Sequence, residues 1–451
     1  MARQSHTDAP LSPTGHDAAQ LAWASARLVE AATPHRMMQE VVAAVNRNAT
    51  WRGEECINLL APEAPMSPTV RALLSAEVGQ RAAEGHIGPA NRWFAGTRHI
   101  DEIESLAVEL LKRVFRSHYA DHRLVASMVG NLAVYTALTS PGDTVMSLPQ
   151  PVGGHSSNRP DGPAGVRGLH VVDIPMRADL TVDLDAFAEI ARRVQPRLVA
   201  LGASMTLFPL PVAEMVDIVS PWGGRVFFDG AHQMGLIGGG QFQDPLAEGA
   251  SVMTGSAGKT FSGPQSGIIV WNDPDIAGPL FHAIFPTLAA THQVNRVAAL
   301  AAAAAEFLEF GAAYMAQIVQ NAQALAEALH GQGIPVWGAD RGFTRTHQVI
   351  VDARPFGGGL KAARLLEAAN IITNKNLLPV DQASDWDRPS GLRLGTTEVT
   401  RYGMRAPEMR RIAGLMADVL QRRQDPAAVQ SAAVDLRRAF PTLQFCFPLD
   451  C

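Results

Sequence analysis

The chain has 451 residues, too many for one small core and about right for two to three domains. Its composition of 47% apolar and 18% charged residues is ordinary for a globular protein, and a net charge of -5 gives no electrostatic reason to expect a nucleic-acid or anionic-membrane partner. Three cysteines without CxxC spacing or clustered histidines predict neither a disulfide framework nor a metal site, so a reducing, cytoplasmic location fits best.

The N-terminus is polar and lacks the apolar segment of a signal peptide. We expect residues 1–16 to form a disordered arm. The most apolar stretch, residues 297–305, is far shorter than the ~20 residues that cross a bilayer, so no membrane span is expected.

Apolar residues recur at helical spacing over residues 17–44, and the apolar run at 57–65 ends in prolines, which predicts a short strand or an extended arm. Helices and strands then alternate. We expect helices at 101–116, 130–138, 183–191 and 212–219, and strands at 143–148, 169–176, 196–204, 224–232, 250–259 and 266–271. After residue 286 we expect an alanine-rich helix, a helix at about 311–329, strands at 347–354 and around Leu392, and a final amphipathic helix at 406–420.

Repeated strand–helix units joined by short loops predict an α/β fold with a mostly parallel sheet, here of seven strands. We expect an N-terminal arm and helix (1–56), a large domain that contains the sheet (57–298), and a smaller α+β domain (299–451). Ligands bind at the carboxyl ends of parallel strands. The polar residues expected at that edge are Ser204, Asp229, His232, Ser256 and Lys259.

Asp229 ends an apolar strand, and Lys259 follows thirty residues later in a loop between two strands. Pyridoxal phosphate (PLP) chemistry needs these two groups: a lysine amine that attaches the cofactor covalently, and a carboxylate that keeps the pyridine nitrogen protonated. His232 is placed to reach the cofactor's phenolic oxygen, and His155 follows a strand end and is placed to stack on the ring. The Gly-Lys-Thr triplet at Lys259 also suggests a P-loop, but the required glycine is replaced by Met253.

Several segments resemble serine hydroxymethyltransferases in sequence and in order. They are INLLAPEAPMSPTV (57–70), AAEGHIGPANRWFAG (82–96), NLAVYTAL (131–138), PGDTV (141–145), GGH (153–155), FFDGAHQMGLIGGG (227–240), VMTGSAGKTFSGPQSGIIVW (252–271), ANIITNKN (369–376) and SGLRLGTTEVTRYG (390–403). The resemblance covers residues from about 57 to 420. It implies a PLP-dependent transferase of fold type I that acts on an amino acid as a homodimer with shared active sites.

The resemblance also implies roles for individual residues. Arg393 would bind the substrate carboxylate through bidentate hydrogen bonds. Ser204 would lie near the cofactor's phenolic oxygen, Ser127 would remain as a hydroxyl donor to the cofactor phosphate, and Glu84 would be an acid/base contributed by the neighbouring subunit.

The chain departs from the family pattern at positions that matter for aldol chemistry. A serine of the substrate segment is replaced by Pro62, and a histidine and an arginine near the cofactor lysine by Gly258 and Gln265. Tyrosines are replaced by Ala82 and by the pair Trp93 and Phe94, which would line a more apolar substrate pocket. Two phosphate-holding elements are also altered, and they now read Ala126-Ser127-Met128 and Ala290-Thr291.

Residues 314–329 and 342–349 resemble threonine transaldolases of natural-product pathways, a branch that includes PLP enzymes of lincosamide antibiotic pathways. The lost phenols and histidine favour an enzyme of antibiotic biosynthesis that acts on a β-substituted amino acid such as a cysteine S-conjugate. The reaction would be β-elimination, or decarboxylation with deamination, without folate. The alternative is an aldol-type enzyme, either a threonine transaldolase or a serine or 2-methylserine hydroxymethyltransferase. A PLP-binding protein without catalysis is disfavoured by the joint presence of Lys259, Asp229 and Arg393.

Overall fold

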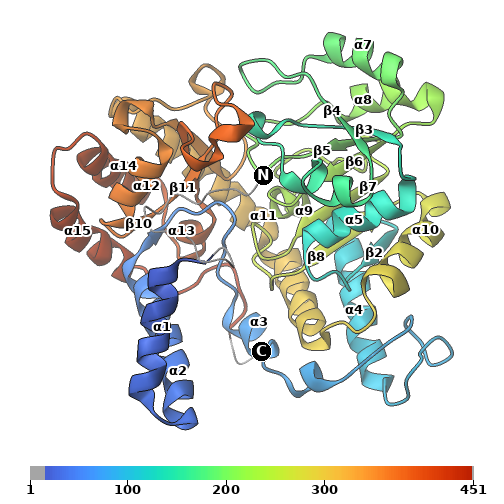
Figure 1. Cartoon of the computed structure of the whole chain (residues 1–451), viewed down its shortest axis with the longest axis horizontal. Coiled ribbons are helices and arrows are strands. Elements are labelled where there is room, and N and C mark those ends of the chain that lie inside the picture. The colour runs from blue at the N-terminus through green and yellow to red at the C-terminus, as the bar shows by residue number, and fades with distance from the viewer. Residues whose placement is uncertain (1–15, 449–451) are drawn as a thin grey trace.

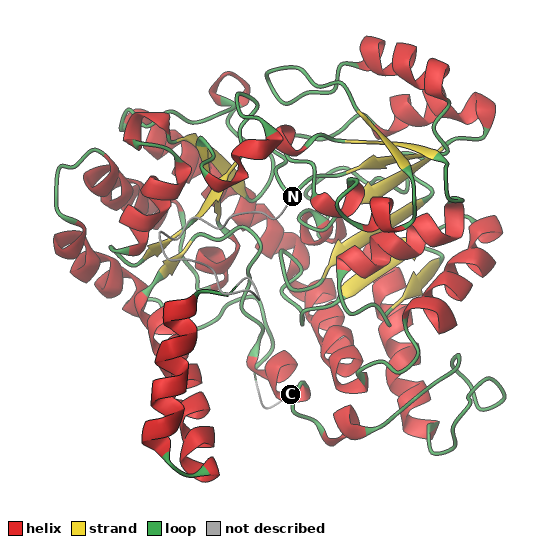
Figure 2. Cartoon of the chain, viewed as in Figure 1, coloured by secondary structure: helices red, strands yellow, loops and turns green. Residues whose placement is uncertain are grey.

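The computed structural model describes residues 16–448, so all but the last residue of the predicted N-terminal arm lies outside the described residues. A seven-stranded sheet forms the centre of the larger part of the molecule (Figures 1 and 2). Its strands, in spatial order, are β2 (Tyr119–Asp121), β8 (Gly267–Trp271), β7 (Val252–Ser256), β6 (Arg225–Asp229), β5 (Leu198–Leu201), β3 (Thr144–Ser147) and β4 (His170–Asp173). Within this sheet, β8 runs in the direction opposite to the other strands, and the pairs among β7, β6, β5, β3 and β4 are parallel, so the predicted mostly parallel α/β sheet is confirmed.

Helices cover both faces of this sheet because the strands are apolar on both sides. Val199 and Leu201 of β5 pack on one face with α4 (Arg98–Phe115), α7 (Leu184–Val194), α8 (Val212–Val219), α9 (Met234–Gly238) and the long helix α11 (Val294–Gly331). Leu198 and Ala200 of the same strand pack on the other face with α5 (Ser127–Leu138), α6 (Pro163–Val166) and α10 (Ala277–His282).

A second core lies at the C-terminal end of α11. There β9 (Gln348–Asp352), β12 (Gly391–Gly395) and β11 (Asn374–Asn376) form an antiparallel sheet, and β1 (Ile57–Asn58) pairs in parallel with β10 (Ile371–Ile372). The surrounding helices are α12 (Gly359–Glu367), α13 (Thr397–Arg401), α14 (Ala406–Leu420) and α15 (Pro426–Arg438). Ile57 and Leu59 pack in this second core, and α11 runs through the predicted boundary at 298/299. The domain limits therefore stay predictions.

Two helical segments differ from the sequence expectation. The helix expected at 17–44 is two helices, α1 (Ala18–Ala31) and α2 (Pro34–Thr50), because Ala32 adopts a left-handed conformation and Pro34 lacks the N–H that would continue a helix. The two helices expected after residue 286 are the single 38-residue α11. Gly311 lies inside it, where a Cβ would come within 2.5 Å of the Phe307 ring.

Helix α11 has the length and apolar composition of a membrane-spanning helix. However, its side chains fill both hydrophobic cores, from Ala299 in the first to Leu329 in the second. It is therefore the central core helix of this fold. Helices α1 and α2 instead form a hairpin that projects from the body of the molecule (dark blue in Figure 1) and leaves apolar side chains such as Val29 and Val45 exposed.

Candidate active site

The carboxylate of Asp229 lies at the carboxyl end of β6 and is buried. Its Oδ2 accepts hydrogen bonds from Asn131 Nδ2 (2.7 Å), Asn158 Nδ2 (3.1 Å) and Ser157 Oγ (3.4 Å), and its Oδ1 accepts one from the Ala231 backbone (3.1 Å). These donors fix the position of the carboxylate at the edge of the sheet, where it would face the pyridine nitrogen of the cofactor.

The carboxylate of Asp229 determines the orientation of both asparagine amides, because it accepts from their nitrogens. The amide oxygens then accept hydroxyl groups, Asn131 Oδ1 from Thr254 (2.6 Å) and Asn158 Oδ1 from Tyr135 (2.8 Å). This buried network extends from the sheet to α5 and fixes the position of the carboxylate.

Lys259 follows β7 in a turn at the same edge of the sheet. Burial lowers the pKa of its amine to about 8, the charge of Arg393 adds to this shift, and the charge of Asp229 opposes it. Among residues 16–448 we find no hydrogen-bond partner for the amine. A lysine with a lowered pKa and no partner is available as a nucleophile near neutral pH.

His155 and Ser204 line one cavity of about 150 Å³, together with Gln150, Gly154, Ser156, Asn376, Leu377 and Trp386. The His155 Nδ1 accepts a hydrogen bond from the Ser157 backbone (3.2 Å), and burial lowers the pKa of the ring. His155 is therefore a neutral aromatic ring on the wall of the cavity. Ser204 Oγ donates to the Gly153 carbonyl (3.0 Å), so the sequence-predicted role of that hydroxyl toward the cofactor requires it to change partner.

Arg393 extends from β12 of the second core toward the first and is buried. Its Nη1 donates to the Ser204 carbonyl (2.5 Å) and lies 3.4 Å from Nε2 of His232, which is also buried. No acidic side chain in the described part of the chain forms an ion pair with Arg393, and burial lowers its pKa to about 10. A buried guanidinium without a carboxylate is costly, so this one is suited to bind an anionic ligand.

The groups predicted to hold the cofactor phosphate lie at the end of β7 and at the start of α5. Ser256 ends β7, and Ser127 is the first residue of α5. No side chain among residues 16–448 caps this helix N-terminus, so its first amides and the Ser127 hydroxyl are available to bind an anion. The donor set of Lys259, Asp229 and this helix start therefore fits PLP.

Glu84, Trp93 and Phe94 are not brought to Lys259 within one chain. They belong to the segment before α4 that extends away from the body of the molecule (light blue in Figure 1). Glu84 accepts a hydrogen bond from Thr291 Oγ1 (2.6 Å), and Trp93 packs on Phe285 with ring centroids 5.0 Å apart. Phe94 is exposed. Their predicted roles depend on a second subunit and stay predictions.

Two of the family departures are neighbours in space. A Cβ at Gly258 would lie 2.6 Å from Cδ of Gln265. The side chain of Gln265 thus fills the space that a histidine at position 258 would need. Pro62 lies beside Ala61, which Gly395 of the Arg393 strand contacts closely, so Pro62 is placed near the end of β12. Its predicted contact with substrate stays a prediction.

Outside this site, Glu104, His122 and His292 offer ligand atoms within 4.8 Å of one another. Both carboxylate oxygens of Glu104 already have donors, His292 Nε2 at 2.6 Å and the Arg92 guanidinium at 2.6 Å. A cation on the same carboxylate opposes the binding of a metal ion. We interpret this cluster as an ion-pair network that anchors the segment carrying Arg92 to α4, and the absence of a bound metal stays a prediction.

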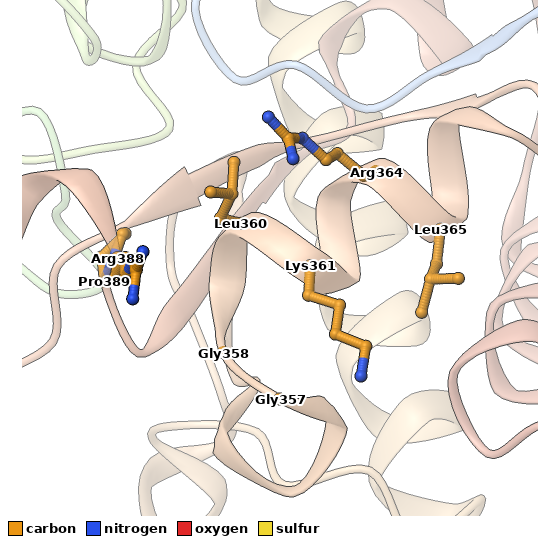
Figure 3. A pocket seen from close by; sticks show the side chains of 8 residues that line it. All are labelled: Gly357, Gly358, Leu360, Lys361, Arg364, Leu365, Arg388 and Pro389. Carbon is orange, nitrogen blue, oxygen red and sulfur yellow. The ribbon is translucent and has the colours of Figure 1, made fainter. Parts of the chain in front are cut away.

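A surface cavity of about 510 Å³ lies at the start of α12 and is lined by Gly357, Gly358, Leu360, Lys361, Arg364, Leu365, Arg388 and Pro389. Figure 3 shows Lys361 and Arg364 extending from this helix in different directions. Because these cations do not converge on one point, the cavity is a weaker candidate site than the edge of the sheet at Lys259.

The sequence did not single out Asn131, Ser157 and Asn158 as site residues. Two features of the sequence could have pointed to a buried polar network. One is the asparagine that opens the mostly apolar segment 131–138, and the other is the Ser-Ser-Asn that follows His155. Their partner, Asp229, is distant in sequence, so only the fold reveals the contact.

One edge of this mostly parallel α/β sheet carries a buried carboxylate and a lysine amine without a hydrogen-bond partner among residues 16–448, and a buried arginine reaches the edge from the second core. This arrangement is that of a PLP-dependent enzyme of fold type I. The family model for serine hydroxymethyltransferase matches residues 35–416. The chain belongs to the serine hydroxymethyltransferase family.

Curated relatives span nearly the whole chain. The serine hydroxymethyltransferase of Methanopyrus kandleri is 45% identical over 411 residues, which cover 91% of this chain and 95% of that protein. The serine hydroxymethyltransferase of Archaeoglobus fulgidus is 42% identical over 394 residues, 87% of this chain and 89% of that protein. The crystal structure of L-threonine transaldolase from Pseudomonas fluorescens superimposes with a TM-score of 0.83 at 26% identity and covers 95% of this chain and 96% of that chain.

Proposed function

We propose that this protein is an aldol-type enzyme that cleaves the Cα–Cβ bond of a β-hydroxy-α-amino acid without tetrahydrofolate. The observation that supports an amino-acid substrate is the buried, carboxylate-free guanidinium of Arg393 beside His232. A substrate carboxylate would complete its hydrogen bonds and neutralise its charge.

The chain's own residues then have distinct tasks. When bound, PLP withdraws electrons from Cα so that a bond to Cα can break. Asp229 would keep the pyridine nitrogen protonated, and His155 would offer its aromatic ring to the cofactor. Lys259, with a pKa of about 8, is able both to accept and to return a proton near neutral pH. Glu84 of the partner subunit would take the proton of the β-hydroxyl group.

Independence from folate is supported by the replacements at Ala82, Phe94 and Gly258. The tyrosines and the histidine that these residues replace are ionisable groups, and their loss leaves a more apolar pocket.

A second candidate is an enzyme of antibiotic biosynthesis that acts on a cysteine S-conjugate, by β-elimination or by decarboxylation with deamination. Ala82, Phe94 and Gly258 support it, because they offer no ionisable group where the family pattern has tyrosines and a histidine. Elimination of a thiolate needs no base for a β-hydroxyl group.

The deciding experiment supplies the PLP-loaded protein with L-threonine, with L-serine in the presence and absence of tetrahydrofolate, and with an S-alkyl cysteine, and identifies the products by mass spectrometry. Glycine and acetaldehyde from threonine would support the aldol proposal. Thiol and pyruvate, or carbon dioxide and ammonia, from the cysteine conjugate alone would replace it by the second candidate. Serine turnover that requires tetrahydrofolate would refute folate independence.

We also propose that the enzyme is a cytoplasmic homodimer with shared active sites. Apolar side chains are exposed on the α1–α2 hairpin and at Trp93 and Phe94, and a second copy of the chain would cover them. Sedimentation that shows an active monomer would contradict the dimer, and recovery of the protein in a membrane or extracellular fraction would contradict the location.

A further inference from the structure

Gln348, the first residue of β9, is completely buried between the two cores. Its Oε1 accepts a hydrogen bond from the Thr206 backbone N–H (2.9 Å), and its Nε2 donates to the Ser204 carbonyl (2.9 Å). A backbone N–H only donates and a carbonyl only accepts, so the two partners leave one orientation of this amide. The second hydrogen of Nε2 is therefore free to bind elsewhere.

The remaining neighbour of this amide nitrogen is Nδ1 of His232, at 3.2 Å. Because the amide nitrogen can only donate, Nδ1 of His232 must accept. Burial, together with the charges of Lys259 and Arg393, lowers the pKa of His232 well below its usual value, so the ring is neutral. A neutral imidazole that accepts at Nδ1 carries its proton on Nε2.

We propose that Gln348 is a positioning residue that fixes the proton of His232 on Nε2, so that His232 presents a hydrogen-bond donor to the cofactor and substrate. The inference does not depend on which bond the enzyme breaks, because it concerns the state of His232 before any reaction. It assigns a role to a residue of β9 that the sequence motifs do not mark.

A second imidazole, that of His347, lies next to His232. Nε2 of His347 lies 3.4 Å from the same Nδ1. The two ring centroids are 5.6 Å apart with an interplanar angle of 14°. The nitrogen–nitrogen distance is shorter than the centroid separation by about twice the distance from a ring nitrogen to its centroid, so the rings lie edge to edge in nearly one plane. His347, with its own pKa lowered to about 3 by burial, is neutral and carries one ring proton, for which the Ala61 backbone carbonyl also competes, so the direction of the hydrogen bond at His232 rests on Gln348.

The other ring nitrogen of His232, Nε2, faces Arg393, and the tautomer decides which ligand atom can bind between them. Its Nε2 lies 3.4 Å from Nη1 of Arg393, which can only donate. With the proton on Nε2, two donors face each other, and an anionic oxygen is the ligand that satisfies both. With the proton on Nδ1 instead, Nε2 would be an acceptor bound to Arg393 and would repel such an oxygen. Gln348 thus determines which kind of ligand atom this position takes.

The test is to measure the protonation of His232 by 15N NMR of the cofactor-free protein labelled at histidine, with the His232 signals assigned from their loss in His232→Gln. In the wild-type protein, Nδ1 should have the chemical shift of an unprotonated imidazole nitrogen and Nε2 that of a protonated one. The opposite assignment would overturn the proposal without the need for any variant at position 348.

Two variants and a control extend the test. In Gln348→Glu a carboxylate replaces the amide with almost the same shape, so the proton should move to Nδ1. In Gln348→Met no donor remains, and both tautomers should appear. The control is Gln243→Met. The Gln243 amide also accepts from a backbone N–H and donates to a backbone carbonyl, both of Leu210, but it makes no contact with His232 among the described residues. An unchanged His232 tautomer in a folded Gln348→Glu protein would refute the positioning role, and so would a control that moves the proton equally.

A second readout uses the cofactor as a reporter. Loss of a donor to its phenolic oxygen should move the pH midpoint of its visible absorbance band upward by about one unit in Gln348→Glu and leave it unchanged in Gln243→Met. An unmoved midpoint in Gln348→Glu would show that His232 does not act on the cofactor through Gln348.

Discussion

Asn131 donates a hydrogen bond of 2.7 Å from Nδ2 to Oδ2 of Asp229, from the middle of α5 to the end of β6. Both side chains are buried, and Asn131 Oδ1 in turn accepts the hydroxyl of Thr254. The carboxylate is therefore held in position by groups that lie behind it, and Oδ1, which accepts one hydrogen bond from the Ala231 backbone, keeps a lone pair for the cofactor.

Replacing Asn131 by Asp should weaken the binding of PLP. The substitution keeps the shape but places a second carboxylate against Asp229, which raises the pKa of the pair and removes a hydrogen bond to a charged group worth ~1.5–3 kcal/mol. We expect the dissociation constant for PLP, measured by absorbance titration, to rise on the order of 10- to 100-fold. Asn272→Asp makes the same chemical change at a half-buried position outside this network and should leave the dissociation constant unchanged. Equal constants in both variants would contradict the role of Asn131.

The attachment of PLP to Lys259 should depend on pH through the lowered pKa of its amine. Below pH about 8 the amine is protonated and not nucleophilic, so the rate at which the cofactor-free protein recovers its visible band should fall about tenfold per pH unit. Above that value the rate should level off. A rate that keeps climbing toward pH 10 would show an ordinary lysine. Lys259→Arg, which stays charged, should not attach the cofactor at any pH.

Arg393→Lys should weaken the binding of the substrate without weakening the binding of the cofactor. An ammonium group cannot reproduce the two parallel hydrogen bonds of a guanidinium to a carboxylate, and the loss is about 3 kcal/mol, or roughly a 100-fold rise in KM. The control is Arg354→Lys, because Arg354 is exposed and binds only Asp352 within its own turn. An unchanged KM with a raised dissociation constant for PLP would reassign Arg393 to the cofactor.

The sequence predicted the parallel sheet and the positions of Asp229 and Lys259 because both follow from local patterns, an apolar strand that ends in a polar residue. It did not predict the three-residue strand β2, since so short a strand carries little pattern. It also did not predict that β8 runs antiparallel to β7, because an apolar pattern does not give the direction of a strand. The partners of Asp229 and His232 were missed for another reason. Asn131 and Gln348 are each about a hundred residues from the side chain they bind, and no spacing rule connects them.

Trp386→Ala should change which substrates are accepted. The indole lines the cavity beside His155 and Ser204 and is itself partly exposed, so its removal opens the cavity with little effect on the core. We expect kcat/KM for β-hydroxy amino acids with a β-phenyl group to rise at least tenfold relative to threonine, measured with both substrates in competition. The control is Trp337→Ala. Trp337 packs against the small hydrophobic cluster that includes Leu207 and Ile350, and it does not line this cavity, so its removal should leave the ratio constant. A constant ratio in Trp386→Ala would remove the indole from the substrate pocket.

Mixing two inactive variants should restore activity if subunits share their active sites. In one subunit Lys259→Ala removes the cofactor attachment, and in the other Glu84→Gln removes the acid/base. A heterodimer of the two would combine the intact Lys259 of one chain with the intact Glu84 of the other in one of its sites, while its second site would have neither. Random reassembly makes about half of the dimers heterodimers, so about a quarter of the wild-type activity should return. The Thr291 hydrogen bond keeps Glu84 beside its own chain's residues 290–291, which the family resemblance places at the partner's cofactor. Activity no higher than that of either variant alone would mean that each chain builds its site alone, or that Glu84 is not part of it.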